Sequence, residues 1–363
     1  MKARSIAVAF ASALATVCAV TTANAENRRE IISDPEPHDY VRVCDVFGAG
    51  FFYIPGSETC LKIGGLIRYE PSHYGSFDGL VKSSDGLDTL VRAELTFDAR
   101  SDTEYGTLRG YTRLRSDLKN GSIGGDVQLR DLIMSLGPVS VGFADSLYDA
   151  NISGEFDRGG ADRAHFARYT LKPNDSVTFT GALEQTDSSR DWQTNVLGKL
   201  SVSRDWARFD VFGAYDTTAD EFALKAIVKS DVSKTIFVEA IATYESGMNF
   251  YSVNPFAATG FSTSNLVGAA RAGSEWSAGG LVGTHVTPRL KASLGAQYFS
   301  NVGHGRMNEK FGGKSDVIRA GLTVDYKIVE NLNAKLAVNH TRFQTSDRDY
   351  GQWHGFLRLD RAF

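Results

Sequence analysis

The chain has 363 residues, of which 42% are hydrophobic and 23% are charged, and its formal net charge is −4 at pH 7. This acidic balance argues against nucleic acid as a partner, because a nucleic-acid-binding surface is basic. The sequence contains three cysteines, too few at close spacing for a metal site of the zinc type.

The first 25 residues predict a secretory signal peptide. Lys2 and Arg4 begin it, an apolar run covers 6–20, and Ala23-Asn24-Ala25 matches the small-residue pattern at which signal peptidase cuts. An N-terminal membrane helix is the alternative, but the run is short for a bilayer span. We therefore expect export and cleavage near Ala25.

Two of the three cysteines remain after this cleavage. Cys18 lies in the signal, whereas Cys44 and Cys60 bracket a short segment rich in glycine and aromatic residues. An even pair in an exported chain favours a disulfide, since the compartment is oxidising. Closing a loop of this length contributes roughly 3 kcal/mol in the chain-entropy model.

From residue 59 onward, apolar and polar side chains alternate. In 91–100, valine, alanine, leucine and phenylalanine occupy the odd positions, and arginine, glutamate, threonine and aspartate the even ones. A period of two is typical of a β-strand with one apolar and one wet face. About sixteen such segments are expected, at 59–70, 86–100, 105–118, 126–137, 138–146, 163–172, 176–185, 192–203, 206–215, 219–230, 235–246, 274–286, 290–300, 315–327, 332–343 and 351–363.

The connections between these segments alternate in length. Turns of a few residues alternate with long connections such as 71–85, 146–162 and 247–273, and only 216–220 is short where a long one is expected. Short turns on one side and long loops on the other are typical of an outer-membrane barrel. The many charges on the wet faces would each cost several kcal/mol in a dry core unless paired, whereas a water-filled lumen accommodates them.

The predicted fold is therefore all-β. We expect a transmembrane antiparallel β-barrel of about 16 strands over 59–363, with short periplasmic turns and long extracellular loops. After residue 25 no apolar stretch approaches the length of a membrane helix. Residues 26–58 then form a separate N-terminal segment.

The fourth of the expected strands, at 126–137, is unusual because both of its faces read as apolar. The residues responsible are Leu129, Leu132, Ile133, Met134 and Leu136. A wall strand that borders an open lumen should carry polar residues on one face. We expect subunit contacts on one side, or packing beneath an inserted loop.

The chain ends on an aromatic residue. Phe363 has the same parity as Trp353, Leu357 and Leu359 in the last alternating segment. This pattern resembles the signal read by the outer-membrane barrel assembly machinery, although Arg361 departs from it. We expect Phe363 to act as that assembly signal.

A family resemblance rests on the segment CDVFGAGFFYIPGSETCLKIGGLIRYE at 44–70. It closely resembles the opening of the general diffusion porins of alphaproteobacteria, where a paired-cysteine block leads into the first strand. The rest of the chain is similar only in architecture, length and terminal Phe. The resemblance implies a homotrimer in outer-membrane lipid and lipopolysaccharide that passes small hydrophilic solutes and ions passively, without a cofactor. It also implies that the disulfide-closed part of 26–58 lies at the periplasmic mouth.

In the porins that the chain resembles, the third long loop folds into the lumen and narrows it. Here that loop, 146–162, carries four acids, which are Asp149, Glu155, Asp157 and Asp162. The basic candidates on the facing wall are Arg68, Arg92, Arg109 and Arg113, followed by Arg168 and Lys199 on later strands. Acids facing bases would set a transverse field across a pore constriction. The alternative is that these are only solvated lumen charges, and the loop at 247–273 is expected to face the surface.

Other functions remain open at this point. An outer-membrane enzyme would need a Ser or Asp beside a His on neighbouring strands, and His340 and His354 fall on the last two. The chain contains no G-x-S-x-G or H-E-x-x-H motif, so we expect no catalysis. A substrate-selective channel and an adhesin are the remaining alternatives.

Overall fold

The computed structural model describes residues 42–75, 86–122, 125–160, 162–186, 193–256, 271–305, 309–312, 315–346 and 349–363. The predicted signal peptide, residues 26–41 of the 26–58 segment and parts of the long connections lie outside these ranges. Within them, no helix is both long and apolar enough to cross a membrane.

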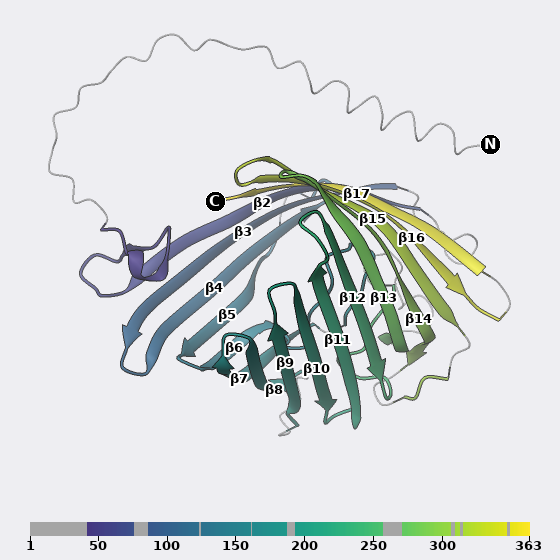
Figure 1. Ribbon diagram of the computed structural model, residues 1–363, viewed down its shortest axis with the longest axis horizontal. Helices are drawn as coiled ribbons and strands as arrows, with labels where there is room; N and C mark the ends of the chain where they lie inside the picture. The colour runs from purple at the N-terminus through teal and green to yellow at the C-terminus, as the bar shows by residue number, and fades with distance from the viewer. Residues whose placement is uncertain are drawn as a thin grey trace, which may run out of the picture. The chain divides into compact units, whose positions relative to one another are not determined.

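Sixteen antiparallel strands of the described chain close into one barrel (Figure 1). The strands are β2 (Cys60–Tyr74), β3 (Gly86–Thr103), β4 (Gly106–Lys119), β5 (Val127–Leu136), β6 (Val139–Asp145), β7 (Arg163–Asn174), β8 (Val177–Gln185), β9 (Asn195–Ser203), β10 (Ala207–Asp216), β11 (Glu221–Asp231), β12 (Ile236–Glu245), β13 (Arg271–Thr287), β14 (Leu290–Gly305), β15 (Asp316–Val329), β16 (Leu332–Gln344) and β17 (Asp349–Ala362). Each pairs with the next, and β17 pairs with β2, so the wall has no free edge. The predicted fold class is confirmed.

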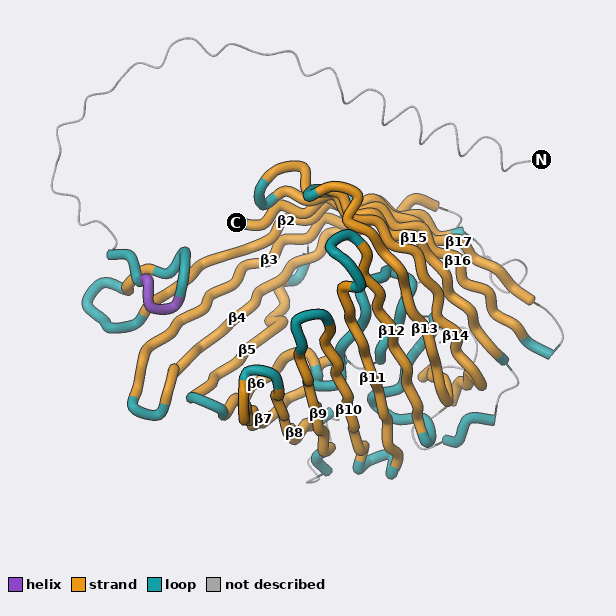
Figure 2. The backbone as a smooth tube through the Cα atoms, in the orientation of Figure 1, coloured by secondary structure: helices purple, strands orange, loops and turns teal. Residues whose placement is uncertain are grey.

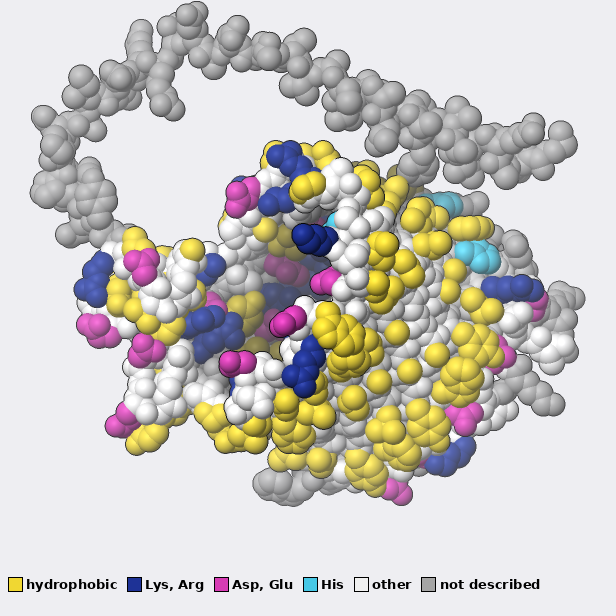
Figure 3. Space-filling view, viewed as in Figure 1, with side chains coloured by type: hydrophobic (Ala, Val, Ile, Leu, Met, Phe, Trp, Pro, Cys, Tyr) yellow, Lys and Arg dark blue, Asp and Glu magenta, His cyan; other side chains and the backbone are white. Residues whose placement is uncertain are grey.

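The alternating pattern sorts side chains between the two faces of the wall. In β11, Phe222 and Leu224 are exposed on the outside, whereas Lys225 and Ile227, which have the opposite parity, are buried. Hydrophobic side chains spread over the outer face of β9–β14, and charged ones gather in the hollow beside it (Figure 3). This division fits a wall with lipid outside and water inside.

The barrel wall is uneven in height. Strands β5–β12 have between 7 and 12 residues each. The other half, from β13 through β17 to β4, has strands of 13 to 18 residues. The backbone trace shows the short strands β6–β9 beside the long β2–β4 hairpins (Figure 2).

A β-bulge corrects the expectation that the fourth strand is apolar on both faces. Arg113 of β4 pairs with Asp131, and the next residue, Leu114, pairs with Leu129, so Arg130 has no partner. The extra residue reverses the parity of the strand at that point. Leu129, Leu132, Met134 and Leu136 therefore all lie exposed on the outer face. Neither subunit contacts nor an inserted loop is needed to explain the pattern.

The disulfide between Cys44 and Cys60 is present, as predicted. It joins a short 3-10 helix, η1 (Asp45–Phe47), and strand β1 (Phe52–Tyr53) to the start of β2. Both cysteines are buried with Phe51 in a small apolar cluster. The barrel itself closes without this bond, because β2 is already paired on both sides.

Candidate functional site: a loop inside the lumen

The connection between β6 and β7 folds into the barrel, and its described residues, 146–160 and 162, are called the inserted loop. At its start, Ser146 Oγ donates a hydrogen bond of 2.6 Å to Glu184 on β8, and the Leu147 amide donates one of 2.7 Å to the same carboxylate. Glu184 is fully buried. A buried carboxylate that accepts several hydrogen bonds is stable only when those donors are fixed. The base of the loop is therefore held to the wall.

Lys225 on β11 holds the middle of the inserted loop. Its ammonium donates hydrogen bonds to the carbonyl oxygens of Tyr148, Ala150 and Gly159, the last two at 3.1 and 2.8 Å. The same ammonium lies 3.9 Å from the centre of the Tyr148 ring. Lys225 is 2% exposed, so three donor hydrogens meet three acceptors away from water. Both arms of the loop are thus tied to one strand.

The tip of the loop reaches the opposite strands. Ser153 binds Glu239 on β12 through its amide and its hydroxyl, each at 2.7 Å. The Arg158 amide and carbonyl both pair with the Gln297 side chain of β14, at 2.7 and 2.9 Å. Buried Arg319 on β15 donates to the Phe156 carbonyl at 2.7 Å. The loop therefore crosses the lumen and is anchored on its far side.

Glu155 is the acid of the inserted loop that meets basic wall residues. Its Oε1 accepts hydrogen bonds from Lys335 Nζ at 2.8 Å and from Arg358 Nη1 at 3.3 Å. Arg358 also pairs with Glu70 on β2. Glu155 thus brings the loop tip to β16 and β17.

A second segment, 246–256, also lies inside the barrel, which corrects the expectation that the loop at 247–273 faces the surface. Tyr251 and Val253 are fully buried, and Phe256 is 1% exposed. The Tyr251 ring packs on Tyr148 of the inserted loop with centroids 5.4 Å apart. Arg319 donates a second hydrogen bond, of 2.7 Å, to the Pro255 carbonyl. The segment lacks charge, and it is stabilised by packing against the inserted loop and by backbone hydrogen bonds to Asp216 and Glu245. Residues 257–270 lie outside the described chain.

The predicted arginines line the wall of the long strands, each beside an aspartate. Arg68 pairs with Asp360, Arg92 with Asp117, Arg109 with Asp98 and Arg113 with Asp131, at 2.7, 2.7, 2.8 and 2.7 Å. Most of these are two-point contacts between a guanidinium and a carboxylate, the geometry that arginine favours. Asp98, Asp117 and Asp131 each bind a second arginine as well, namely Arg100, Arg115 and Arg163, so these four aspartates are compensated by a larger number of arginines. We call these four pairs the arginine wall.

Arg168 and Lys199 lie on the low half of the barrel, away from the arginine wall. Arg168 pairs with Glu184 at 3.1 Å, the same carboxylate that holds the base of the inserted loop. Lys199 is 3.7 Å from Asp210. Arg168 is thus part of the support behind the loop, whereas Lys199 pairs with the neighbouring strand β10.

The remaining acids of the inserted loop differ in their surroundings. Asp149 is exposed, and no basic nitrogen of the described chain lies within 4.0 Å of its carboxylate. Reduced solvation inside the barrel, with repulsion from Asp145 and Asp162, raises its pKa to about 6. Asp157 is 3% exposed and accepts a hydrogen bond of 2.9 Å from the Ile152 amide. Burial raises the pKa of Asp157 to about 7, so this carboxyl braces the loop from within instead of lining open space.

Asp162 stands where the loop returns to the wall. It is exposed, its carbonyl accepts the Ser146 amide at 2.9 Å, and its carboxylate accepts the Arg163 amide at 2.9 Å. These contacts close the neck of the inserted loop. Asp162 and Asp149 therefore lie on the same, accessible part of it.

Sequence reasoning missed the residues that hold the loop, namely Glu184, Lys225, Glu239, Gln297 and Arg319. Each has the inward parity of its strand, so the alternation could have marked it as a lumen residue. Their partners are backbone atoms of a loop far away in the chain, which no local pattern indicates. The structure thus assigns support of the loop to residues that looked like ordinary lumen charges.

The two histidines that an enzyme reading required lie on opposite faces of the wall. His340 contacts the exposed Trp353 on the outside, with ring centroids 4.6 Å apart. His354 is 9% exposed and stacks on Tyr74 at 4.3 Å. They cannot act as a pair. Within the described residues, no cluster of three His, Cys, Asp or Glu side chains could hold a metal ion.

Comparison with known proteins identifies this architecture. A family model described as a porin subfamily matches residues 30–356. The chain belongs to this porin family. It is 30% identical to outer membrane protein IIIA of Rhizobium leguminosarum bv. viciae, over 94% of this chain and 90% of that protein. It is 31% identical to porin Omp2a of Brucella ovis, over 61% of this chain and 74% of the relative.

Solved structures agree with the fold of this porin. The outer membrane channel DcaP of Acinetobacter baumannii superimposes with a TM-score of 0.65 at 15% identity, covering 86% of this chain and 99% of that one. OmpT of Vibrio cholerae, expressed in the outer membrane, gives a TM-score of 0.56 at 11% identity over 85% and 99% of the two chains. The porin is a passive channel of the Gram-negative outer membrane, and the resemblance drawn from residues 44–70 is confirmed.

Proposed function

We propose that the constriction of this porin lies between the inserted loop and the arginine wall, and that it admits small hydrophilic solutes and ions. The observation that carries the proposal is the path of the loop, which is bonded to β8, β11, β12, β14 and β15 across the lumen. A loop fixed at so many points narrows the channel permanently. The remaining opening is bordered by the arginine wall and the exposed acids of the loop.

The charges of this constriction are unequal in their effect. Each arginine of the wall binds an aspartate, and three of these aspartates bind a second arginine as well, so the wall carboxylates are fully compensated. Asp149 carries a carboxylate without a paired base, and Asp162 lies on the same part of the loop. Asp157 and Glu155 fix the loop, and Arg168 supports it from behind through Glu184. We infer a moderate preference for cations, set mainly by Asp149 and Asp162.

Reversal potentials across a salt gradient test this assignment. Asp149→Asn removes a negative charge and should reduce the cation preference, whereas Arg92→Ser or Arg113→Ser removes a positive charge and should increase it. Asp175→Asn, in the exposed β7–β8 turn, is the matched control and should change nothing. The constriction has been assigned to the wrong loop if both sets of variants match the wild type.

The outer surface suits self-association. OmpT of Vibrio cholerae, a structural neighbour at 12% identity with a TM-score of 0.50, is described in a trimer form. On this chain, two shallow apolar hollows lie side by side on the outside of β5–β9, bordered by Leu132, Phe143, Phe179 and Leu183. We infer that the porin assembles as a homotrimer in a bilayer of lipid and lipopolysaccharide.

The C-terminus supports a role in assembly. Phe363 exchanges two backbone hydrogen bonds with Gly65 of β2, at 3.0 and 3.1 Å, and its side chain is exposed. It thus lies at the seam where the barrel closes. We infer that the barrel assembly machinery reads this residue, that the segment 26–58 lies on the periplasmic side, and that the protein catalyses no reaction.

A further inference from the structure

A single row of charged side chains crosses five strands on the lumen side of the tall wall. The register pairs His285 of β13 with Lys291 of β14, Lys291 with Asp325 of β15, Asp325 with Lys335 of β16, and Lys335 with Arg358 of β17. Paired residues lie at the same height on a sheet, about 4.8 Å apart from strand to strand. The row therefore places three permanent cations and a histidine around one carboxylate.

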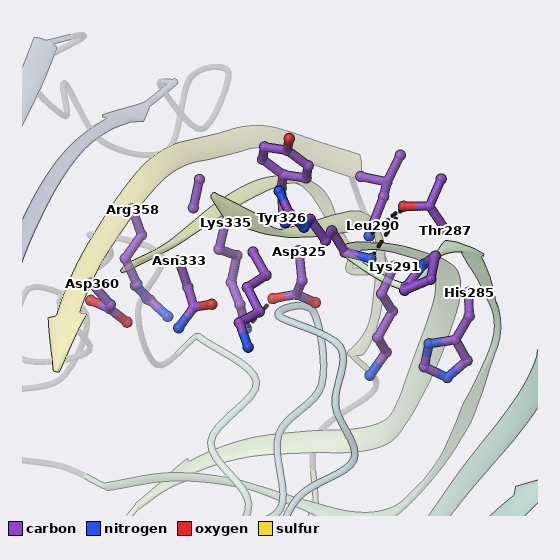
Figure 4. A pocket seen from close by; sticks show the side chains of 14 residues that line it. His285, Thr287, Leu290, Lys291, Asp325, Tyr326, Asn333, Lys335, Arg358 and Asp360 are labelled. Atoms are coloured by element: carbon purple, nitrogen blue, oxygen red, sulfur yellow. Dashed lines mark hydrogen bonds and ion pairs between the residues drawn. The ribbon is translucent and has the colours of Figure 1, made fainter. Parts of the chain in front are cut away.

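These side chains project into a common cavity, of about 340 Å³ (Figure 4). The cavity lies beside the short β13–β14 and β15–β16 turns, which marks it as the periplasmic end of the lumen. Arg289 and Lys327 add two further cations to its lining. Asp360, the other acid of the lining, is bound by Arg68 from outside the cavity. The cavity thus has a clear excess of positive charge.

Lys291 is the cation of the row that lacks an acidic partner. Within the described residues, no carboxylate oxygen lies within 4.0 Å of its ammonium, which instead lies 4.4 Å from the centre of the buried Phe237 ring. A cation held over an aromatic ring keeps its other donors available. Lys291 is therefore oriented and ready to bind an anion.

Besides Asp325, the protein already places a carboxylate from outside the wall on this row. Glu155 of the inserted loop binds Lys335 and Arg358 at the opposite end. The row thus binds a carboxylate near Arg358 and keeps an unpaired ammonium at Lys291. This combination suits the binding of oxyanions. A solute leaving the constriction would meet this row next.

We propose that the row around Lys291 is a transient binding site for small oxyanions, carboxylate or phosphate, on the periplasmic side of the constriction. The ammonium of Lys291 binds the oxyanion, and Arg289, Lys327 and the uncompensated field of the cavity attract it. The site binds anionic solutes briefly on the periplasmic side of the inserted loop, whose exposed acids repel them. This binding is an addition to passive diffusion, and it rests on the proposed function of the protein as a conducting channel.

Single-channel recording in planar bilayers tests the site. Succinate or inorganic phosphate, added to each side in turn in KCl, should interrupt the wild-type current briefly, and neutral glycerol should not. Lys291→Gln should weaken this binding about tenfold, the loss expected for one charged hydrogen-bonding partner. Comparing succinate with phosphate identifies the preferred group. The KCl current before any addition reports separately that the channel conducts.

Three further variants make the outcome decisive. Lys291→Arg keeps the charge and should keep the interruptions, and Lys234→Gln, in the exposed β11–β12 turn, removes the same charge elsewhere and should leave them unchanged. Glu155→Gln removes one of the carboxylates that bind Lys335 and Arg358 and should lengthen the interruptions. Absence of interruptions by both anions in a conducting wild type, or equal binding by Lys291→Gln, overturns the proposal.

Discussion

Two carboxyl groups of the inserted loop, three residues or more from any strand, differ by what surrounds them. Asp149 is accessible but lies in a confined space with two other acids, and its pKa is raised to about 6. Asp157 is buried and its pKa is raised to about 7. Both groups therefore change charge within the physiological range, although ordinary aspartates stay ionised there.

Ion preference should depend on pH through Asp149. A carboxyl group is neutral below its pKa, so lowering the pH from 8 to 5 should reduce the cation preference, with a midpoint near 6. Reversal potentials in a KCl gradient measure this. The effect should weaken in concentrated salt, because the Debye length falls from about 10 Å at 0.1 M to about 3 Å at 1 M. Asp149→Asn should remove the step near pH 6, and a step that persists in this variant would assign it to another group.

Lys225 should keep the inserted loop still. Lys225→Met conserves the apolar stem but leaves the carbonyls of Tyr148, Ala150 and Gly159 without their donor, at a cost of about 1–3 kcal/mol for each buried carbonyl that stays unpaired. Open-channel current noise should rise, with a wider distribution of conductance levels. Lys234→Met, in an exposed turn, serves as the control. A Lys225→Met channel as quiet as the wild type would show that the loop is held by its other contacts.

At the scale of elements, the bulge in β5 predicts that two single-residue deletions differ in their effect on barrel assembly. Deleting Arg130 restores regular alternation, with Leu129 and Leu132 outside and Asp131 inside, so the barrel should still assemble. Deleting Leu129 also removes one residue, but it moves Arg130 to the lipid face, which costs about 2–4 kcal/mol at the membrane midplane. The yield of folded barrel, read from the shift in gel mobility on boiling, compares the two. Equal yields would mean that the bulge does not set the parity of β5.

The inserted loop and the segment 246–256 together occupy part of the barrel interior. The inserted loop and 246–256 pack on each other and on β8–β16, so the lumen beside these strands is filled with protein. The arginine wall is left to border the open part. In such an interior, the residues that hold the inward segments in place are separate from the residues that contact solutes.

At the scale of the whole molecule, the homotrimer is the main expectation. Unheated detergent extracts should run on gels as a large species and collapse to the monomer on boiling. Leu132→Asp places a charge in the apolar hollow outside β5 and should favour the monomer. Leu224→Asp, equally outward on β11 but outside both hollows, is the control for the general cost of a charge facing lipid. A wild-type monomer by light scattering in mild detergent would refute the trimer.

Local sequence determined the wall of this porin. Side chains on a strand alternate with a period of two, so the wet face of each strand could be read without knowing its neighbours. All sixteen strands appear within a few residues of their predicted positions, and the pair Cys44–Cys60 is bonded. The inward parity of Arg68, Arg92, Arg109 and Arg113 was likewise a local property.

Only the tertiary structure decided what those side chains meet. The partner of each arginine depends on the register of adjacent strands, and the register that closes the barrel aligned His285 with Arg358 four strands away. The bulge at Arg130 reversed the parity of β5, and the sequence alone could not locate this bulge. The anchors of the inserted loop are backbone carbonyls and amides, which every residue carries, so no side-chain pattern could indicate that Lys225 or Gln297 would bind them.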